Sequence, residues 1–495
     1  MRGPRAGGAV GWMGRCAWIA QLALLIPATV YAQGYRGWTS TSVQVVELRP
    51  IGLDSVPRTD VVTDAQGRFL YQGSEVSCVL VSICTGYFAR DDESTIAATQ
   101  DLGITLWGFG MEGLSFTAHV RGRARGGGGT VWPRSDDEFD ALLGYAQLER
   151  GRVRLRAGRM EARSGLGFSG FDGASAAYSA GTARVEVYGG LSLARGLREP
   201  QNEALRGLDG FLLDQSVLIV GGSAAARPWD TQMTARYQRE ILRDRSSLVS
   251  ERVSVDVARS FPRSRLHGSI DYDLAFQRWG KGQVTLSVPL QEGRWLAEAT
   301  ALRYLPYFDL STLWGIFEPV SYSEVMGRLG WSPDGRLGAW ISAGRRSYGD
   351  TETTVILRPM RDTGWRVDAG ARWRAAEAWI LNGSYVLEWG PGGFLSSADA
   401  SLHFEVTDRL SATATALTFQ QIEEYRLGEG RAFGGGASAE YAFGERAFLS
   451  AGFSLIRHRD GGNVFTSPWN QGRAWTSLRF DLGRDPGLSA RGGGA

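Results

Sequence analysis

The chain has 495 residues, of which 43% are hydrophobic and 21% are charged, and its 54 basic and 52 acidic residues give a formal net charge of +2. This near balance offers no strongly basic surface, so we expect no nucleic-acid partner. Beyond the first 32 residues, no run of about 18 apolar residues could form a helix that spans a bilayer, which excludes a helical membrane protein.

Residues 1–32 have the features of a cleaved signal peptide. Three arginines form a basic start, the apolar stretch Ala17–Val30 follows, and the small Ala32 suits cleavage before Gln33. A signal anchor is the alternative, but the apolar stretch is short and contains Pro27. Cys16 precedes the apolar stretch, an order that does not favour a lipoprotein. We therefore predict that the chain is exported.

Residues 33–95 differ from the rest of the chain because their alternation of apolar and polar residues is poor. They contain one strand-like run, Thr41–Leu48, and then a polar stretch that leads to Cys78 and Cys84. An exported chain meets an oxidising compartment, so we predict a Cys78–Cys84 disulfide. Two thiols without a nearby His make a poor metal site, and we predict none. We expect a small β-rich unit at the periplasmic end of the molecule or in the mouth of a barrel.

From about residue 97 the alternation becomes regular, and pairs of strands joined by turns that contain Gly predict hairpins. The first hairpin joins residues 102–107 to residues 114–121. Further pairs are expected at residues 142–149 with 152–160, 174–179 with 184–193, 217–225 with 232–241, 248–259 with 266–278, 284–290 with 295–304, and 321–331 with 337–346. The remaining strands are expected around residues 365, 380, 398, 412, 437, 449 and 474–482.

Three segments show the pattern most clearly: Leu266–Gln277, Trp365–Arg374 and Ala398–Val406. In each of them one face of the strand is apolar and carries no charge, while the other face is polar, because successive side chains point to opposite faces. A transmembrane barrel strand needs such a pattern over about 9 to 11 residues. We therefore predict an all-β fold, a transmembrane antiparallel β-barrel of about 18–22 strands over residues 96–483, with a polar Gly-rich tail at residues 484–495.

The expected connections alternate between tight turns and long loops, as in bacterial outer-membrane barrels. Candidate long loops are residues 126–138, 196–214, 306–319, 421–432 and 460–472. A soluble β-sandwich also alternates, but a sheet of this length needs closure to remove its edges. The last strand, Arg473–Leu482, resembles the closing strand that the barrel-assembly machinery recognises, although the tail after it departs from the usual terminal Phe.

The polar faces of the expected strands carry charges of both signs, which predicts a polar, water-filled lumen. The same residues could instead form salt-bridged rungs that stiffen the wall. The candidate pore-lining residues are Arg121, Arg123, Arg152, Arg154, Arg156, Arg184, Glu186, Arg252, Asp256, Asp271, Asp273, Arg366, Asp368, Arg372, Asp399, Glu405 and Arg479.

The densest basic run is Arg152–Met160, which leads through Ser164–Gly173 to Arg184–Tyr188. Over about residues 150–195 this resembles outer-membrane porins, including carbohydrate- and alginate-type porins, in which an "RxGRQ" strand leads through a Gly-Leu-Gly turn to "FDG" and an Arg-containing return strand. The resemblance implies that Arg154 and Arg156 line a channel. Met160 replaces the Gln of that pattern, and strict alternation places Arg159 on the lipid side unless a bulge at Gly158 re-aims it.

An enzyme is the weaker alternative. The four histidines, His119, His267, His403 and His458, show no spacing typical of a nucleophile and its base, and we expect no catalytic residue, no metal and no cofactor. The function predicted is that of an outer-membrane porin-like channel for the diffusion of small hydrophilic solutes. The alternative is a scaffold or polymer-export conduit whose N-terminal unit contacts a periplasmic partner.

The expected location is the outer membrane. The expected partners are outer-membrane lipid and lipopolysaccharide, the barrel-assembly machinery and small hydrophilic solutes. The sequence leaves open whether the barrel forms a homotrimer.

Overall fold

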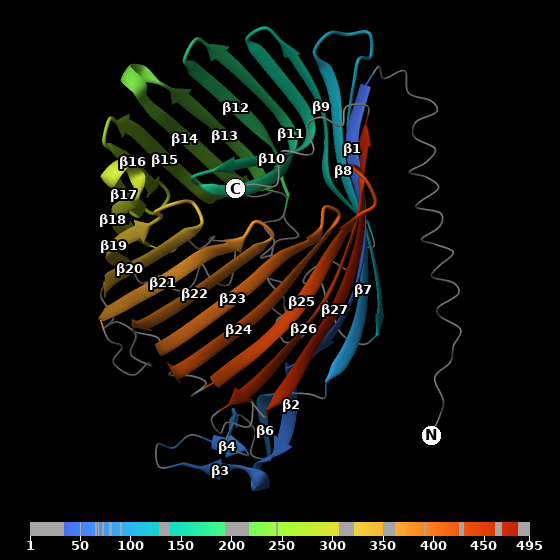
Figure 1. Ribbon diagram of the computed structural model, residues 1–495, viewed down its shortest axis with the longest axis vertical. Helices are drawn as coiled ribbons and strands as arrows, with labels where there is room; N and C mark the ends of the chain where they lie inside the picture. The colour runs from blue at the N-terminus through green and yellow to red at the C-terminus, as the bar shows by residue number, and fades with distance from the viewer. Residues whose placement is uncertain are drawn as a thin grey trace.

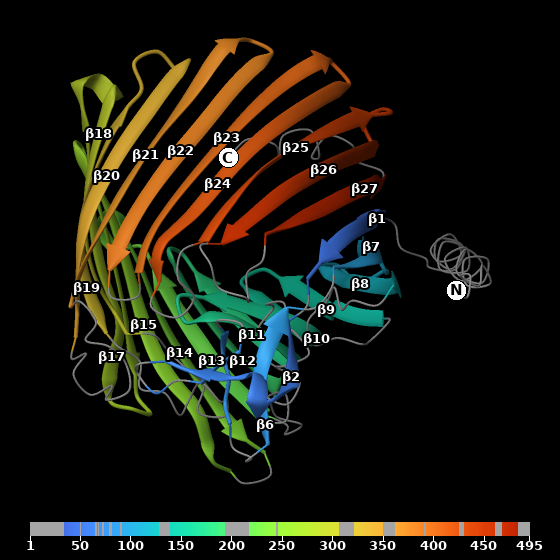
Figure 2. The same cartoon turned by 90° about the horizontal axis from the view of Figure 1, so that it is seen from below.

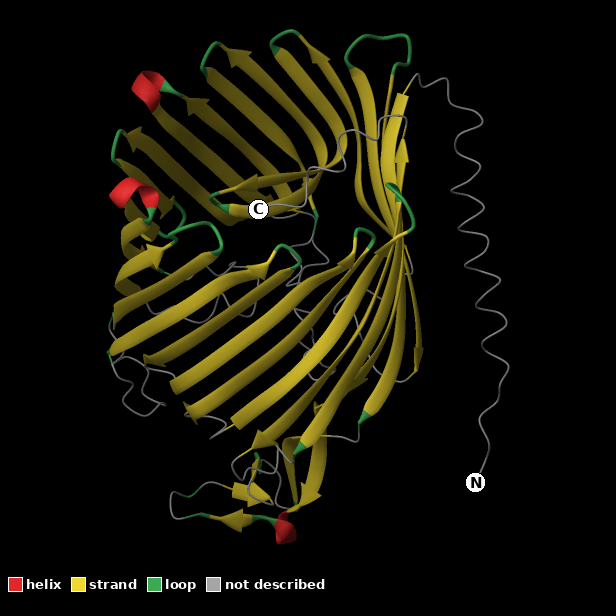
Figure 3. Ribbon diagram, in the orientation of Figure 1, coloured by secondary structure: helices red, strands yellow, loops and turns green. Residues whose placement is uncertain are grey.

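The structure, a computed structural model, describes residues 34–49, 51–64, 67, 69–71, 74–78, 82–89, 92–127, 139–193, 217–243, 246–305, 321–349, 362–390, 393–424, 430–460 and 468–483. The predicted signal peptide, most of the five predicted long loops and the tail at residues 484–495 lie outside this part of the chain. Within it, no helix has the length and apolarity needed to cross a membrane. Three short 3-10 helices occur there, η2 (Arg58–Asp60), η4 (Pro228–Asp230) and η5 (Gln291–Gly293) (Figure 3).

Twenty-two strands form one antiparallel sheet that closes on itself, because β1 pairs with both β27 and β7 (Figure 2). The prediction of an all-β transmembrane-type barrel is therefore confirmed. The barrel strands are β1 (Gly34–Leu48), β7 (Glu93–Trp107), β8 (Leu114–Gly127), β9 (Phe139–Arg150), β10 (Val153–Ser164), β11 (Gly167–Ala180), β12 (Ala183–Ser192), β13 (Val217–Ala226), β14 (Thr231–Leu242), β15 (Leu248–Phe261), β16 (Ser264–Asp273), β17 (Arg278–Leu290), β18 (Trp295–Tyr304), β19 (Tyr322–Trp331), β20 (Leu337–Tyr348), β21 (Thr363–Ala376), β22 (Trp379–Gly390), β23 (Gly393–Thr407), β24 (Leu410–Glu424), β25 (Gly430–Ala442), β26 (Ala447–Asp460) and β27 (Trp469–Gly483).

The two ends of the barrel differ in the length of their connections. At one end every connection is short, as at residues 151–152, 181–182 and 262–263. The first residues of β1 and the last residues of β27 lie at this same end. The other end carries the longest connections, residues 49–92, 193–216 and 305–321. We call these the short-turn end and the long-loop end.

The N-terminal region differs from the sequence-based expectation in two ways. Residues 34–48 are not part of a separate unit, because β1 is a full barrel strand paired along its length with β7 and β27. Thr39 and Thr41 lie on its outward face, where both hydrogen-bond Gln100 of β7. These polar side chains satisfy one another's hydrogen-bonding groups. β1 can therefore be a barrel strand without the continuous apolar stripe from which the other strands were predicted.

The appendage, as we name residues 51–89, projects from the long-loop end (Figure 1). It contains the two-stranded sheet of β2 (Ile51–Pro57) and β6 (Ile83–Ala89) and the small sheet of β3 (Val62–Thr63), β4 (Phe69–Tyr71) and β5 (Ser74–Glu75). Val56, Val76 and Cys84 form its core, against which Phe69 and Phe88 pack. It was expected at the periplasmic end or in the mouth of the barrel, and in the structure it lies beyond the long-loop end.

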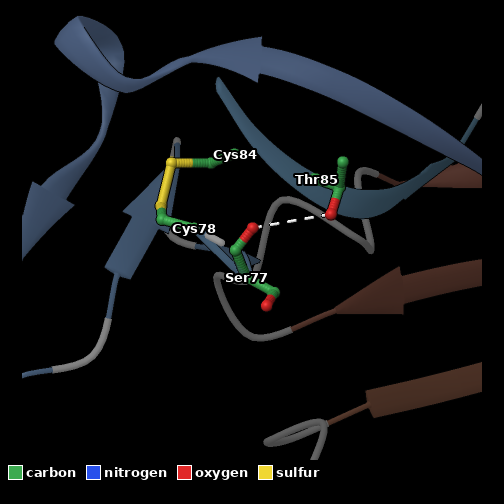
Figure 4. Close-up of a disulfide and its surroundings, with 4 residues drawn as sticks. All are labelled: Ser77, Cys78, Cys84 and Thr85. Carbon is green, nitrogen blue, oxygen red and sulfur yellow. Dashed lines mark hydrogen bonds between the residues drawn. A yellow bond between two sulfur atoms is a disulfide. The ribbon is translucent and has the colours of Figure 1, made fainter. Parts of the chain in front are cut away.

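The predicted Cys78–Cys84 disulfide is present in the appendage (Figure 4). It joins β6 to the segment before it, and beside it Ser77 and Thr85 exchange two backbone hydrogen bonds of 2.8 Å. A core of three buried side chains is too small to hold such a unit firmly. The disulfide therefore supplies part of the stability that burial cannot.

One predicted strand ends earlier than expected. The apolar stripe of residues 266–277 was interpreted as a single strand, but β16 ends at Asp273 and a tight turn follows. Asp273 Oδ1 accepts a hydrogen bond of 3.1 Å from the Phe276 amide, and Gln277 adopts a positive φ of 54°. An Asp side chain that accepts from the backbone competes with the strand ladder and favours a turn.

Candidate channel interior

The two faces of the barrel wall carry different side chains. Large apolar side chains such as Val187, Val220, Val325 and Leu455 are more than half exposed on the outer face. The alternate positions of the same strands carry charged and small polar side chains, which pair across neighbouring strands. The wall therefore presents an apolar surface outward and a polar surface inward, as a lipid-embedded barrel requires.

The structure places sixteen of the seventeen predicted pore-lining residues on inward positions of the wall. The exception is Arg152, which lies with Gly151 in the tight turn between β9 and β10 and is exposed there. The sequence pattern extended β10 one residue too far, because the turn keeps the alternation of polar and apolar side chains. The inward residues are Arg121, Arg123, Arg154, Arg156, Arg184, Glu186, Arg252, Asp256, Asp271, Asp273, Arg366, Asp368, Arg372, Asp399, Glu405 and Arg479.

Most of these charges form ion pairs along the inner wall. Glu186 accepts from Arg154 at 3.2 Å and from Arg184 at 2.7 Å. Arg252 contacts Asp271 at 3.2 Å, and Arg236 pairs with Asp256. The inner surface is thus polar but nearly balanced in charge. The two interpretations of these residues are compatible, because charges that pair across the wall also make the inner surface hydrophilic.

The densest ion-pair cluster was missed by the sequence analysis. Arg346 of β20 contacts Glu324 of β19 at 2.9 Å and also pairs with Glu388 of β22. Arg366 lies 3.7 Å from the second oxygen of Glu388. The side chains of Arg346 and Glu324 are only 15% and 8% exposed. Strand parity could have identified Arg346, because it alternates with the outward Arg345.

A second missed residue is Asp101 of β7. Its Oδ1 accepts from Arg121 Nε at 2.8 Å and lies 3.1 Å from His119 Nε2. The His119 ring also packs edge-on against Trp38 of β1, with 5.2 Å between the two ring centroids. This histidine is therefore part of a wall cluster that joins β1, β7 and β8, and no hydroxyl nucleophile contacts it among the described residues.

The end of one hairpin leaves the wall and enters the lumen. The pairing of β10 with β9 stops at Arg159, and that of β11 with β12 stops at Phe171, while β10 and β11 stay paired to Ser164 and Gly167. Residues 160–170 are therefore not paired with a wall strand on either side, apart from a backbone hydrogen bond of 2.8 Å that the Leu193 amide, just after β12, donates to the Gly170 carbonyl oxygen. We call this segment the inward hairpin, and Figures 1 and 2 show it inside the barrel.

Two paired glycines allow the hairpin to bend away from the wall. Gly158 has a positive φ of 129°, and a Cβ there would lie 2.2 Å from the Gly144 carbonyl oxygen. A Cβ on Gly173, its cross-strand neighbour, would lie 2.0 Å from the Gly189 carbonyl oxygen. Only glycine permits such close approaches of neighbouring backbones.

Arg159 would point into the lumen only if a bulge at Gly158 re-aimed it. The register between β10 and β11 shows no shift, so Arg159 stays on the outer face. There it makes two hydrogen bonds of 2.8 Å to Asp172 and one of 2.8 Å to the Ala141 carbonyl oxygen of β9. The bend separates β10 from β9 beyond this point, and Arg159 satisfies a carbonyl that no longer faces a strand partner.

The inward hairpin is fixed to the inner wall of β13, β14 and β15. Met160 and Phe171 pack against Ile219 of β13 in a fully buried cluster. At the tip, the Leu166 carbonyl oxygen accepts a hydrogen bond of 3.0 Å from Arg252 Nη1. Ser169 bonds Gln238, and Gln238 donates to the buried Glu240 at 3.0 Å. Apolar burial and several hydrogen bonds thus hold the hairpin in the lumen.

A cavity of about 210 Å³ lies between the inward hairpin and the wall. Arg154, Arg156 and Arg236 line it together with Glu161 and Glu186. Arg156 donates to Gln147 at 2.9 Å and lies over the Tyr145 ring. Water and small polar solutes can occupy such a space, so the inward hairpin does not pack tightly against the wall on this side.

Comparisons with known proteins support this fold and no finer assignment. No protein-family model matches the chain, and no curated protein matches it. Among solved structures, the siderophore receptor PirA from Pseudomonas aeruginosa aligns over 90% of this chain and 80% of its own, with 13% identity and a TM-score of 0.51. The Acinetobacter baumannii protein OccAB4 aligns over 92% of this chain and 99% of its own, with 8% identity and a TM-score of 0.38.

The likeness to PirA agrees with the barrel fold that the resemblance to porins implied. The comparisons give no support to the carbohydrate- and alginate-type porins in particular. At such low identity the likeness extends to architecture alone. The chain therefore has the fold of an outer-membrane β-barrel.

Proposed function

We propose that this chain is an outer-membrane channel through which small hydrophilic solutes diffuse, and that the inward hairpin sets the width of its narrowest part. The observation that carries the proposal is the combination of a charged inner wall with a hairpin fixed inside the lumen by Arg252 and by the Met160–Phe171–Ile219 cluster. A polar interior excludes apolar solutes, and a fixed obstruction limits size.

A 22-stranded barrel encloses a wide space, which outer-membrane proteins of this size commonly obstruct. In the part of this chain that the structure describes, the inward hairpin is the wall segment that enters the lumen and packs on its inner surface. It leans on β13–β15 and leaves the opposite wall, β18–β23, uncovered by it. We infer a conduit that is narrowed on one side.

The lengths of the connections suggest how the barrel is oriented in the outer membrane. Short turns face the periplasm and longer loops face outward in bacterial barrels. The appendage extends from the long-loop end, so we place it outside the cell. The alternative function, a scaffold or export conduit whose N-terminal unit contacts a periplasmic partner, requires that unit at the short-turn end. The orientation that we propose therefore favours the channel over this alternative.

The experiment is electrical. The chain is refolded from residue 33 onward, inserted in a planar bilayer and measured for conductance and for reversal potential under a salt gradient. In a second protein, residues 161–170 are replaced by a two-glycine turn that keeps β10 and β11 joined. We expect stable ohmic steps from the first protein and larger steps from the second. The matched control shortens the 443–446 turn at the short-turn end, which should leave conductance unchanged.

Two results would count against the proposal. Electrical silence of correctly folded, heat-modifiable protein would refute the open channel. Equal conductance of the shortened and unshortened proteins would keep the channel but refute the role of the inward hairpin.

A further inference from the structure

A cavity of about 550 Å³ opens on the inner wall of β18–β23, across the lumen from β10 and β11 (Figure 2). Its floor is largely backbone, because the inward positions Gly330 and Gly338 carry no side chains. A Cβ would lie 3.8 Å from the nearest atom at Gly330 and 3.9 Å at Gly338, so both positions are open toward the lumen. The Trp340 ring borders this space and lies over Gly370. We call this cavity the glycine hollow.

Two of the charges that line the glycine hollow are occupied with each other. Arg328 Nε lies 3.9 Å from Glu298, and the Arg328 guanidinium stacks 4.5 Å from the centroid of the Trp340 ring. Glu298 also accepts a hydrogen bond of 3.0 Å from the Ser287 hydroxyl. The other charged side chains that line the hollow are Arg294, Arg372 and Asp399.

Arg372 of β21 and Asp399 of β23 have no counter-charge on the wall around them. The cross-strand neighbours of Arg372 are Gly338 and Asn382. Asp399 accepts a hydrogen bond from the Ser384 hydroxyl, and no cation of the described residues lies at ion-pair distance from it. The same holds for Arg372 and the described carboxylates.

The chain next to these two residues supplies no hidden partner. The turns at residues 377–378 and 408–409, which follow β21 and precede β24, belong to the described part of the chain. Between β22 and β23 only residues 391 and 392 lie outside it, and these are Pro and Gly, which carry no charge. The two opposite charges therefore face the lumen of the described barrel wall uncompensated by their own strands.

The register keeps Arg372 and Asp399 apart. β22 runs between their strands and presents the neutral side chains of Asn382 and Ser384. Two strand spacings amount to roughly 10 Å, so the guanidinium and the carboxylate stand on either side of β22. A solute that lies over Asn382 and Ser384 meets a positive group on one side and a negative group on the other. A simple anion there is repelled by Asp399, and a simple cation is repelled by Arg372.

We propose that the glycine hollow binds zwitterionic α-amino acids, with the carboxylate on Arg372, the ammonium group on Asp399 and the side chain in the space beside Trp340. A guanidinium binds a carboxylate through two parallel N–H donors, and an ammonium group donates to a carboxylate. Arg294, at the edge of the hollow before β18, adds attraction for the carboxylate end. The inference rests on the proposed function and names a class of solute that the channel takes.

The test compares three probes of similar size on the full chain from residue 33 onward. L-Alanine carries both charges, L-lactate lacks the amine and L-alaninamide lacks the carboxylate. Saturation-transfer NMR in detergent measures the dissociation constant of each probe without requiring the channel to conduct. The variants are Arg372→Gln and Asp399→Asn. The matched controls are Arg374→Gln and Glu405→Gln, which remove inward charges of the same two strands outside the hollow.

A hydrogen bond to a charged group contributes about tenfold or more in affinity. L-Lactate and L-alaninamide should therefore each bind at least about tenfold more weakly than L-alanine. Arg372→Gln should make L-alanine bind no better than L-alaninamide, and Asp399→Asn should make it bind no better than L-lactate. The two controls should bind L-alanine normally. Equal binding of L-lactate and L-alanine by the unaltered chain would overturn the proposal, as would normal binding of L-alanine by both variants.

Conductance in potassium chloride separates this inference from the proposed function. Ohmic steps without binding of L-alanine would refute the amino-acid site and keep the channel. Binding of L-alanine by a folded barrel that is electrically silent would refute diffusion through the barrel and keep the site. Unaltered heat modifiability of each variant shows that the barrel has folded.

Discussion

Replacement of Arg346 by Met tests whether the inner wall is held by its ion pairs. The Arg346 side chain is 15% exposed and compensates Glu324, which is 8% exposed, at 2.9 Å. Removal of one partner of a buried pair leaves an uncompensated charge and commonly costs about 3–5 kcal/mol. The lumen gives water some access to Arg346, so we expect the lower end, a loss of about 3 kcal/mol in the free energy of unfolding.

The structure also predicts which second substitution restores stability. Glu388 keeps Arg366 at 3.7 Å when Arg346 is lost, whereas the ion pairs of Glu324 include only Arg346 in the described part of the chain. Glu324→Gln should therefore recover most of the loss in the Arg346→Met background, and Glu388→Gln should recover little. The assay is urea unfolding in lipid vesicles followed by tryptophan fluorescence. A loss under about 1 kcal/mol for Arg346→Met, or equal recovery by both Gln variants, would refute this reasoning.

Three further predictions concern the hairpin and the appendage. Gly173→Val should destabilise the bend, since its side chain would collide with the Gly189 carbonyl. The control is Gly126→Val, because no atom lies within 4 Å of a Cβ at that position. Heat modifiability should be lost at a lower temperature in Gly173→Val than in the control, and equal temperatures would contradict the role of Gly173. Arg252→Ala removes the hydrogen bond to the hairpin tip, so single-channel current should become noisier, and a steady current would contradict this role. Cys78→Ser should lower the stability of the appendage by about 2 kcal/mol, visible as proteolysis within residues 51–89 while the barrel stays intact, and unchanged proteolysis would contradict it.

The barrel could be predicted from the sequence because alternation is a local property. The stripes around residues 365–374 and 398–406 face lipid as expected, since a strand buried in a bilayer on one face cannot avoid the pattern. The run Thr41–Leu48 was recognised as strand-like but β1 was not assigned to the barrel, because Thr39 and Thr41 satisfy their polarity through Gln100. That compensation depends on a strand distant in sequence, so no local pattern reports it.

The inward hairpin left one signal in the sequence. The alternation of β10 reverses at its far end, because Arg159, Glu161 and Arg163 follow at the positions that carry Val153 and Leu155 earlier in the strand. Of these three, only Arg159 was noted, and the close backbone approaches at Gly158 and Gly173 that allow the bend are not visible in a sequence pattern. The charged residues of the inner wall were found by parity, but the ion pairs that they form could not be assigned. The Arg346 cluster requires the register of β19, β20 and β22, which the sequence leaves undetermined.

The central claim is an open, polar channel narrowed by the inward hairpin. Single-channel conductance of the refolded chain, compared with that of the protein in which residues 161–170 are shortened, tests it most directly. We expect stable ohmic steps in both proteins and a larger step when the hairpin is shortened. Silence of the folded, heat-modifiable barrel in both forms would contradict the account.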